Sequence, residues 1–331
     1  MKSFALKNRF KKMYIQKKEN VSGSVLKGIL LMISSMTIVP IMDGLAKFLS
    51  SDYPIAEVVW GRYIFHFFYL FPIVLFKYGP SALLPRHLAL QIIRGGLLVC
   101  STFFFFAAIA EMPLADTLAL VFISPIIVTT LSSVLLGEVV GVRRWSAVSF
   151  GFLGALVIIR PGFNNIEIGT IFALTAGTIY AFYIIATRKL SGSAPPLITL
   201  TFTALLGAVI MSVLVPFQWI EPSKIDWLLM AAMGACAALG HFLLIKAFDN
   251  AKASVLAPFS YFEIIVATII GFVIFDDFPD TITWLGIGII ILSGVYISVR
   301  ERKVGEKSLE MEAKESNSKD LSNRVTRNAN R

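Results

Sequence analysis

The sequence predicts an all-α integral membrane protein with ten transmembrane helices, arranged as two inverted five-helix repeats. Three observations lead to this fold class: an apolar composition, ten long apolar runs and an internal repeat. Of the 331 residues, 56% are hydrophobic and only 15% are charged, whereas about 25% of the residues in a soluble domain are charged. The composition therefore indicates a chain that lies largely in lipid.

Ten apolar runs, most of them close to 20 residues long, account for this composition. An α-helix of about 20 residues spans the hydrocarbon core of a bilayer, and the alternating strands of a barrel do not give runs that are apolar throughout. The expected helices are residues 25–49, 58–76, 88–110, 114–136, 145–159, 168–187, 197–217, 227–247, 253–275 and 281–299.

The net charge of +9 is distributed unevenly along the chain. Lysine and arginine gather in the N-terminal segment, in alternate loops and in the C-terminal tail. Because cationic loops stay in the cytoplasm during insertion, both termini are predicted to be cytoplasmic, with the chain in the bacterial inner membrane. The charge thus indicates orientation in a lipid bilayer and not nucleic-acid binding. Residues 1–24 are expected to form a basic segment, and residues 301–331 a disordered tail.

An internal repeat relates two segments at an offset of 139 residues. The matched pairs are Ala108 with Ala247, Glu138 with Asp277, and Trp145 with Trp284. The two halves are predicted to be residues 25–162 and 163–300. Because each half has an odd number of helices, the second half must enter the membrane from the opposite side, as in many secondary transporters. This plan predicts a substrate site near the bilayer midplane, between the halves.

Two segments, RGGLLVCSTFFFFAAIAEMPLAD and LAPFSYFEIIVATIIGFVIFDDFPD, together with Leu-Gly-Glu after the fourth run, resemble the EamA-type transporters of the drug/metabolite transporter superfamily. The Ala-Pro-x-x-Tyr-x-Glu and Phe-Pro-Asp pattern is similar to that of the S-adenosylmethionine-uptake-like subgroup. The resemblance covers about residues 25–300 and implies a ten-helix carrier of metabolites. Asp276-Asp277 stands where that family usually has Gly-Glu.

Glu263 is the first candidate for the substrate site because it lies near the centre of the run 253–275. A charged side chain there costs roughly 2.5–3.5 kcal/mol on insertion scales. Its helical face, which Ser260 shares, is therefore expected to point into the protein. Glu263 would bind a cationic substrate group or a coupling proton. The alternative is a structural hydrogen bond to a neighbouring helix.

The second run carries a further candidate pair, Arg62 and His66, one helical turn apart. The planar fork of Arg62 suits a carboxylate or a phosphate, which makes it the candidate for an anionic substrate group. The alternative is an ion pair with Asp43 or Glu57. His66 could titrate near neutral pH, or it packs against the aromatic residues beside it.

Two further positions are candidates for coupling or gating. Asp43 lies in the first run, and the i,i+4 spacing of Asp43 and Lys47 predicts that they neutralise each other. Ser124 and Pro125 lie in the middle of the fourth run, where the proline is expected to bend the helix and to free a backbone carbonyl. Such a bend suits a gate or the wall of a cavity.

Tyr180 and Tyr183 form an aromatic stripe on the sixth run. Such a stripe either lines a cavity for a planar ligand or packs in a core. Arg94, near the start of the third run, is expected to reach the cytoplasmic interface. Cys100 and Cys236 lie within apolar runs and are given a packing role.

These observations predict a secondary active transporter that moves a small polar metabolite by alternating access. Amino acids and their derivatives are the leading class, and the resemblance adds S-adenosylmethionine-like cargo. The sequence holds no His-Glu-x-x-His, P-loop or Gly-x-Ser-x-Gly motif, so no catalytic residue, metal or cofactor is expected. The alternatives are a non-transporting membrane subunit or a channel and, less favoured, a membrane-embedded enzyme. Direction, coupling ion and oligomeric state stay open.

Overall fold

The structure is a computed structural model that describes residues 2–80, 87–124, 167–190, 194–250 and 262–289. It also describes individual residues between 127 and 158, residues 256 and 259, and residues between 291 and 296, and it places side chains from residue 25 onward. Within this part of the chain every regular element is a helix. The elements are α1 (Lys2–Leu49), α2 (Ile55–Tyr78), α3 (Leu88–Glu111), α4 (Leu114–Val121), α7 (Ile168–Lys189), α8 (Pro196–Leu214), the 3-10 turn η2 (Val215–Phe217), α9 (Lys224–Asn250) and α11 (Phe262–Phe275).

Six of the described helices are long and apolar enough to cross a membrane. They coincide with six of the predicted runs and begin or end within about three residues of the predicted bounds. The all-helical membrane fold is thereby confirmed. The ninth run is represented by the shorter apolar helix α11. Parts of the fourth, fifth, ninth and tenth runs lie outside the described residues.

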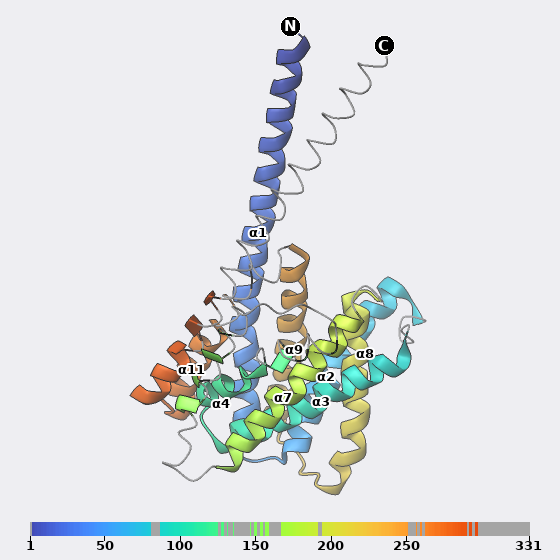
Figure 1. Cartoon of the computed structure of the whole chain (residues 1–331). Helices are drawn as coiled ribbons and strands as arrows, with labels where there is room; N and C mark the ends of the chain where they lie inside the picture. The colour runs from blue at the N-terminus through green and yellow to red at the C-terminus, as the bar shows by residue number, and fades with distance from the viewer. Residues whose placement is uncertain are drawn as a thin grey trace.

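Helix α1 is longer than the first apolar run. Its membrane-spanning part is Val25–Leu49, but the helical backbone already begins at Lys2. Figure 1 shows the N-terminal half of α1 projecting away from the helical bundle. The basic segment therefore continues the first transmembrane helix instead of forming a separate element.

Prolines set the starting points of three helices. Pro54, Pro113 and Pro195 are the N-cap residues of α2, α4 and α8, each with φ near −55° and an extended ψ. The missing N–H of proline is harmless at a helix start, where the first N–H groups have no intrahelical acceptor.

Helix α4 ends much earlier than its apolar run. It stops at Val121, and a turn at Phe122 and Ile123 follows directly before Ser124. A proline ring crowds the carbonyl of the residue four positions before it, and Pro125 stands four positions after Val121. The expected continuous helix 114–136 is therefore wrong at this point, where the backbone breaks instead of bending. Pro125 itself lies outside the described residues.

The helix contacts of α1 and α2 resemble those of α7 and α8. Helix α1 packs against α9 and α11, and helix α7 packs against α3 and α4; α2 contacts α8 and α9, and α3 also contacts α8. In the view of Figure 1, α4 and α11 lie on one side of α1, and α2, α3, α7 and α8 lie on the other. The largest buried cluster, which includes Tyr63, Phe106 and Met230, joins α1, α2, α3, α4, α8, α9 and α11.

The contact between α2 and α9 depends on one glycine. A Cβ atom at Gly234 would lie 2.8 Å from the backbone nitrogen of His66 and would also meet Phe65. Small residues allow helices to approach closely within a membrane. Gly234 thereby allows α9 to bring its own side chains next to those of α2, around the cavity described below.

Candidate functional site

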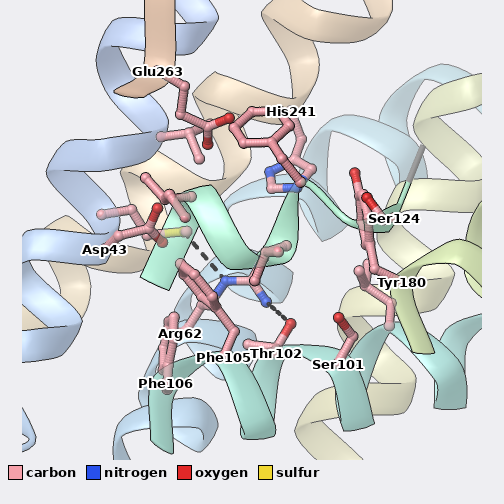
Figure 2. Close-up of a pocket in the computed structure, with 16 residues that line it drawn as sticks. Asp43, Arg62, Ser101, Thr102, Phe105, Phe106, Ser124, Tyr180, His241 and Glu263 are labelled. Carbon is pink, nitrogen blue, oxygen red and sulfur yellow. Dashed lines mark hydrogen bonds between the residues drawn. The ribbon is translucent and has the colours of Figure 1, made fainter. Parts of the chain in front are cut away.

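A cavity of about 170 Å³ lies at the junction of α1, α2, α3, α4, α7, α9 and α11. Figure 2 shows its polar side chains converging from these helices, with apolar side chains between them. The polar lining consists of Asp43, Arg62, Ser101, Thr102, Ser124, Tyr180, His241 and Glu263. The structure therefore brings together five of the predicted site residues: Asp43, Arg62, Ser124, Tyr180 and Glu263.

Arg62 projects from α2 into this cavity and is only 3% exposed. Its Nη1 donates to Thr102 Oγ1 at 3.1 Å, and its Nε donates to Met42 Sδ at 3.3 Å, as the dashed lines in Figure 2 indicate. The guanidinium carbon lies 4.6 Å from the centre of the Tyr63 ring, within the range of a cation–π contact. These contacts orient the guanidinium without neutralising its charge.

The alternative interpretation of Arg62, an ion pair with Asp43 or Glu57, is wrong for this structure. Among the described residues, Arg62 forms a hydrogen bond or ion pair only with Thr102 and Met42. Glu57 instead accepts a hydrogen bond from the backbone N–H of Ile220 at 3.1 Å. Among the described residues, the side-chain hydrogen bonds of Arg62 therefore go only to the neutral groups of Thr102 and Met42.

The predicted neutralisation of Asp43 by Lys47 is also wrong. Lys47 Nζ lies 2.8 Å from Asp277 Oδ2 and donates to the carbonyl of Met112 at 2.9 Å. Lys47 is near the end of α1, where it meets the ends of α3 and α11, so these distant partners are closer than the residue one turn back. Asp43 is 1% exposed, and its Oδ1 has no hydrogen-bond partner among the described residues.

Glu263 lies in the first turn of α11 and lines the same cavity as Asp43 and Arg62. The expectation that its helical face points into the protein agrees with this position. Ser260, which was expected to share the face, lies outside the described residues, as does Pro125. Ser124 does reach the cavity, directly after the break in α4.

His66 is 2% exposed, and neither of its ring nitrogens has a hydrogen-bond partner among the described residues. It is absent from the cavity lining and lies behind His241, with ring centroids 6.0 Å apart. The Nδ1 of His241 lies 2.9 Å from the carbonyl oxygen of Ala237. The predicted site omits His241, although the signal that selected His66, a histidine within an apolar run, was present there too.

Tyr180 and Tyr183 stack with centroids 5.4 Å apart and an interplanar angle of 27°. Only Tyr180 lines the cavity. Behind it, the hydroxyl of Tyr183 accepts a hydrogen bond from Arg94 Nη2 at 3.2 Å. Arg94 is 5% exposed, so the expectation that it reaches the cytoplasmic interface is wrong. Hydroxyl groups on α7 and α8 provide acceptors within the protein.

Comparison with known families decides the classification of the chain. The model of the EamA-like transporter family matches residues 26–160 and again residues 167–299. The chain belongs to the EamA-like transporter family. Membership of this family and the six apolar spans together identify a multi-pass membrane protein.

Several curated relatives of this EamA protein have names that describe transport. The S-adenosylmethionine uptake transporter of Rickettsia prowazekii is 27% identical over 278 residues, which are 84% of this chain and 94% of the relative. The riboflavin transporter of Vibrio cholerae is 30% identical over 193 residues, 58% of this chain and 65% of the relative. The pseudopaline exporter of Pseudomonas aeruginosa is 27% identical over 280 residues, 82% and 95% of the two chains. These names point to transporters of small molecules and not to enzymes.

A solved crystal structure is similar to this EamA chain, with a TM-score of 0.63 at 16% identity. The similarity covers 83% of this chain and 98% of the other. At this level of identity the likeness concerns the fold alone.

The backbone at the end of α11 shows why Asp276-Asp277 can stand where the first half of this EamA chain has Gly-Glu. Asp276 has a φ of +58°, in the left-handed region that glycine adopts readily and that aspartate tolerates. At the repeat offset of 139, Asp276 corresponds to Gly137 and Asp277 to Glu138. The N–H of Asp277 donates to the carbonyl of Gly271 at 2.9 Å. Asp276 therefore takes the left-handed conformation, the backbone N–H of Asp277 closes the helix end, and the Asp277 carboxylate pairs with Lys47.

Proposed function

We propose that this chain is a secondary active transporter of a small polar metabolite in the bacterial inner membrane. One observation carries the proposal: the cavity holds the guanidinium of Arg62 and the carboxylates of Asp43 and Glu263. Among the described residues these groups form no ion pair with one another. Charged groups at membrane depth are costly and mark ligand pathways. A ligand that carries both a positive and a negative group would bind the carboxylates and the guanidinium of this cavity together.

The residues take complementary roles in this proposal. The fork of Arg62 binds a carboxylate, and Thr102 and Met42 hold the fork in place. Asp43 and Glu263 bind an ammonium group or another cation. Glu263 is also the candidate for a coupling proton, and Ser124 with Pro125 for a gate. Ser260 stays a predicted partner of Glu263.

Amino acids and their derivatives meet these requirements because they carry an ammonium group and a carboxylate together. An S-adenosylmethionine-like compound adds a sulfonium cation for the carboxylates and a planar base for the wall around Tyr180. The relative from Rickettsia prowazekii supports this option. Tyr183 and His66 act from behind the lining, where they support Tyr180 and His241.

The size of the cavity supports a mechanism with more than one conformation. Small-molecule sites have volumes of about 300–1,000 Å³, whereas this cavity has about 170 Å³. A ligand of nucleoside size therefore requires the surrounding helices to move apart. Alternating access provides such a movement.

The helix contacts support the proposed inverted repeat of ten helices, with halves at residues 25–162 and 163–300. Helices α1, α2, α3 and α4 can be matched in order with α7, α8, α9 and α11. If the halves are related in this way, each contact in one set must have an equivalent. The equivalents are α7–α3 for α1–α9, α7–α4 for α1–α11, and α8–α3 for α2–α9, and all six contacts occur. Ten helices would put both termini on the same side of the membrane, and the distribution of lysine and arginine favours the cytoplasmic side.

Counterflow in sealed liposomes tests the proposal. Purified protein is reconstituted into liposomes that are loaded with a pool of amino acids, S-adenosylmethionine and riboflavin. The exchanged compound is identified by mass spectrometry. We expect saturable exchange of one zwitterionic class, with strong loss in Arg62→Ala and Glu263→Gln. Lys246→Gln is the matched control because Lys246 is exposed and pairs with Asp249 at the surface. Flux without saturation or counterflow would indicate a channel. Failure of folded protein to exchange any compound, with and without a proton gradient, would contradict the proposal.

A further inference from the structure

Arg94 is a second buried cation, and it has no acidic partner among the described residues. It lies on α3, between α7 and α8, and is 5% exposed. Its Nε donates to Thr187 Oγ1 at 2.9 Å, and its Nη1 donates to Thr203 Oγ1 at 3.0 Å. Its Nη2 donates to Tyr183 at 3.2 Å, and its guanidinium carbon lies 5.1 Å from the centre of that ring. All of these partners are neutral.

The two threonines are fixed as acceptors. Thr187 donates its own proton to the carbonyl of Tyr183, and Thr203 donates its proton to the carbonyl of Thr199, each at 2.8 Å. Their remaining lone pairs therefore face Arg94. The result is a guanidinium held in one orientation with its positive charge uncompensated.

Gln91, one turn before Arg94, adds a donor without an acceptor. Its Oε1 lies 3.5 Å from Arg94 Nη1. Its Nε2 is buried and has no partner among the described residues, and the whole side chain has 0% exposure. A buried donor without an acceptor destabilises the folded state. Beside an unneutralised guanidinium, this donor gives the cluster an excess of N–H groups and a deficit of acceptors.

We infer that Arg94 and Gln91 form a second anion-binding site, which takes a carboxylate or phosphate group. An oxyanion would accept from the amide of Gln91 and from the guanidinium, and it would neutralise the charge at the same time. Tyr183 connects this site to the central cavity, because it contacts Arg94 on one side and stacks on Tyr180 on the other. The anion is the charged group of a passing solute or of a lipid headgroup.

Thermal unfolding of full-length protein in nanodiscs tests the site without requiring transport. In neutral phosphatidylcholine discs, chloride is replaced by acetate or inorganic phosphate at constant ionic strength. The measurement is made in the Arg62→Ala background, so that the central cavity does not contribute. Ligand binding to the folded state raises the unfolding midpoint by mass action, and we expect a saturable rise that is lost in Arg94→Gln.

Two milder variants separate binding from structure. Arg94→Lys keeps the charge but lacks the planar fork, so the apparent anion affinity should fall at least tenfold. Gln91→Leu removes a donor that has no partner among the described residues, so the midpoint without anion should hold or rise while the anion affinity falls. If Arg94→Gln fails to fold, these two variants decide the result.

A second arm identifies the source of the anion. Discs that contain phosphatidylglycerol are compared with neutral discs without added acetate or phosphate. An Arg94-dependent rise in these discs assigns the site to a lipid headgroup, and a rise only with soluble anions assigns it to a solute. The inference is overturned if Arg94→Gln and Arg94→Lys respond to anions as the parent protein does, or if neither source raises the midpoint. Counterflow is scored separately, so loss of this site leaves the proposed carrier function standing.

Discussion

Lys47 and Arg62 are both cations on transmembrane helices, but their surroundings are opposite. Lys47 has an acidic partner in Asp277 and a backbone acceptor in Met112. Among the described residues, the hydrogen bonds of Arg62 go only to a hydroxyl and a thioether, although two carboxylates line the same cavity. A cation that is paired with a carboxylate of the protein, as Lys47 is, holds helices together. A cation held in position with its charge unneutralised is suited to a ligand. The predictions below follow from this difference.

The largest expected effect is on transport by Arg62→Ala. Truncating one member of a buried charge pair typically costs about 2–5 kcal/mol, so the apparent affinity for the exchanged compound should fall by roughly 30-fold or more. The unfolding midpoint should change less than the affinity, because the hydrogen-bond partners that Arg62 leaves behind, Thr102 and Met42, are neutral. Exchange kinetics and thermal unfolding of the same preparation measure both quantities. A large loss of stability with unchanged kinetics would reverse the assignment of Arg62.

Lys47→Met should show the opposite pattern. Removal of the Lys47 ammonium leaves Asp277 without an ionic partner, and the Asp277 side chain is 29% exposed. The free energy of unfolding should fall by about 1–3 kcal/mol, the usual penalty of an unsatisfied polar group, while the substrate affinity of folded protein stays near that of the parent. The double variant Lys47→Met/Asp277→Asn should recover part of the loss. Strict additivity of the two single effects would contradict an energetic coupling between these side chains.

The same substitution at two aspartates sharpens the comparison. Asp277→Asn weakens a formed ion pair, so it should lower the free energy of unfolding by about 1 kcal/mol. Asp43→Asn removes a buried carboxyl group whose Oδ1 has no partner among the described residues, so it should raise stability by about 1 kcal/mol while exchange declines. Denaturation of both variants in the same lipid measures the difference. If both substitutions changed the free energy of unfolding in the same direction, the distinction between the Lys47–Asp277 pair and the cavity around Arg62 would be lost.

The smallest expected effect is at Tyr53, between α1 and α2. Its hydroxyl donates to Asp226 Oδ2 at 2.8 Å, and this hydrogen bond raises the pKa of Tyr53. The raised pKa means that the contribution to stability is fully present below the usual tyrosine pKa of about 10. It is lost as the pH rises through the raised value. Tyr53→Phe should therefore be slightly less stable at neutral pH, and the difference should vanish in alkali. A difference that grows with pH would contradict this assignment.

Apolar run length predicted most helix bounds, because a backbone in lipid must satisfy its hydrogen bonds within the helix. The proline at position 125 predicted a bend in the fourth run, but hydropathy does not report that the helix ends at Val121. Arg62 and Glu263 were expected to face the interior because a charge at membrane depth is costly, and both line the cavity; their roles in binding stay predictions. The sequence prediction failed for Lys47, whose partner is 230 residues away in the chain, and for Arg94, whose acceptors are on other helices. The spacing of residues within one helix does not predict contacts with residues on other helices.

The central claim is that the transported compound occupies the cavity around Arg62, and substrate protection of a cysteine tests it most directly. Cys100 and Cys236 are replaced by alanine, and a reporter is introduced as Ser124→Cys in the cavity lining. Ser50→Cys, near the end of α1, is the matched control outside that lining. At ten times its dissociation constant, the exchanged compound should slow alkylation of the reporter about tenfold and leave the control unchanged. Equal alkylation rates with and without a compound that the protein exchanges would contradict the claim.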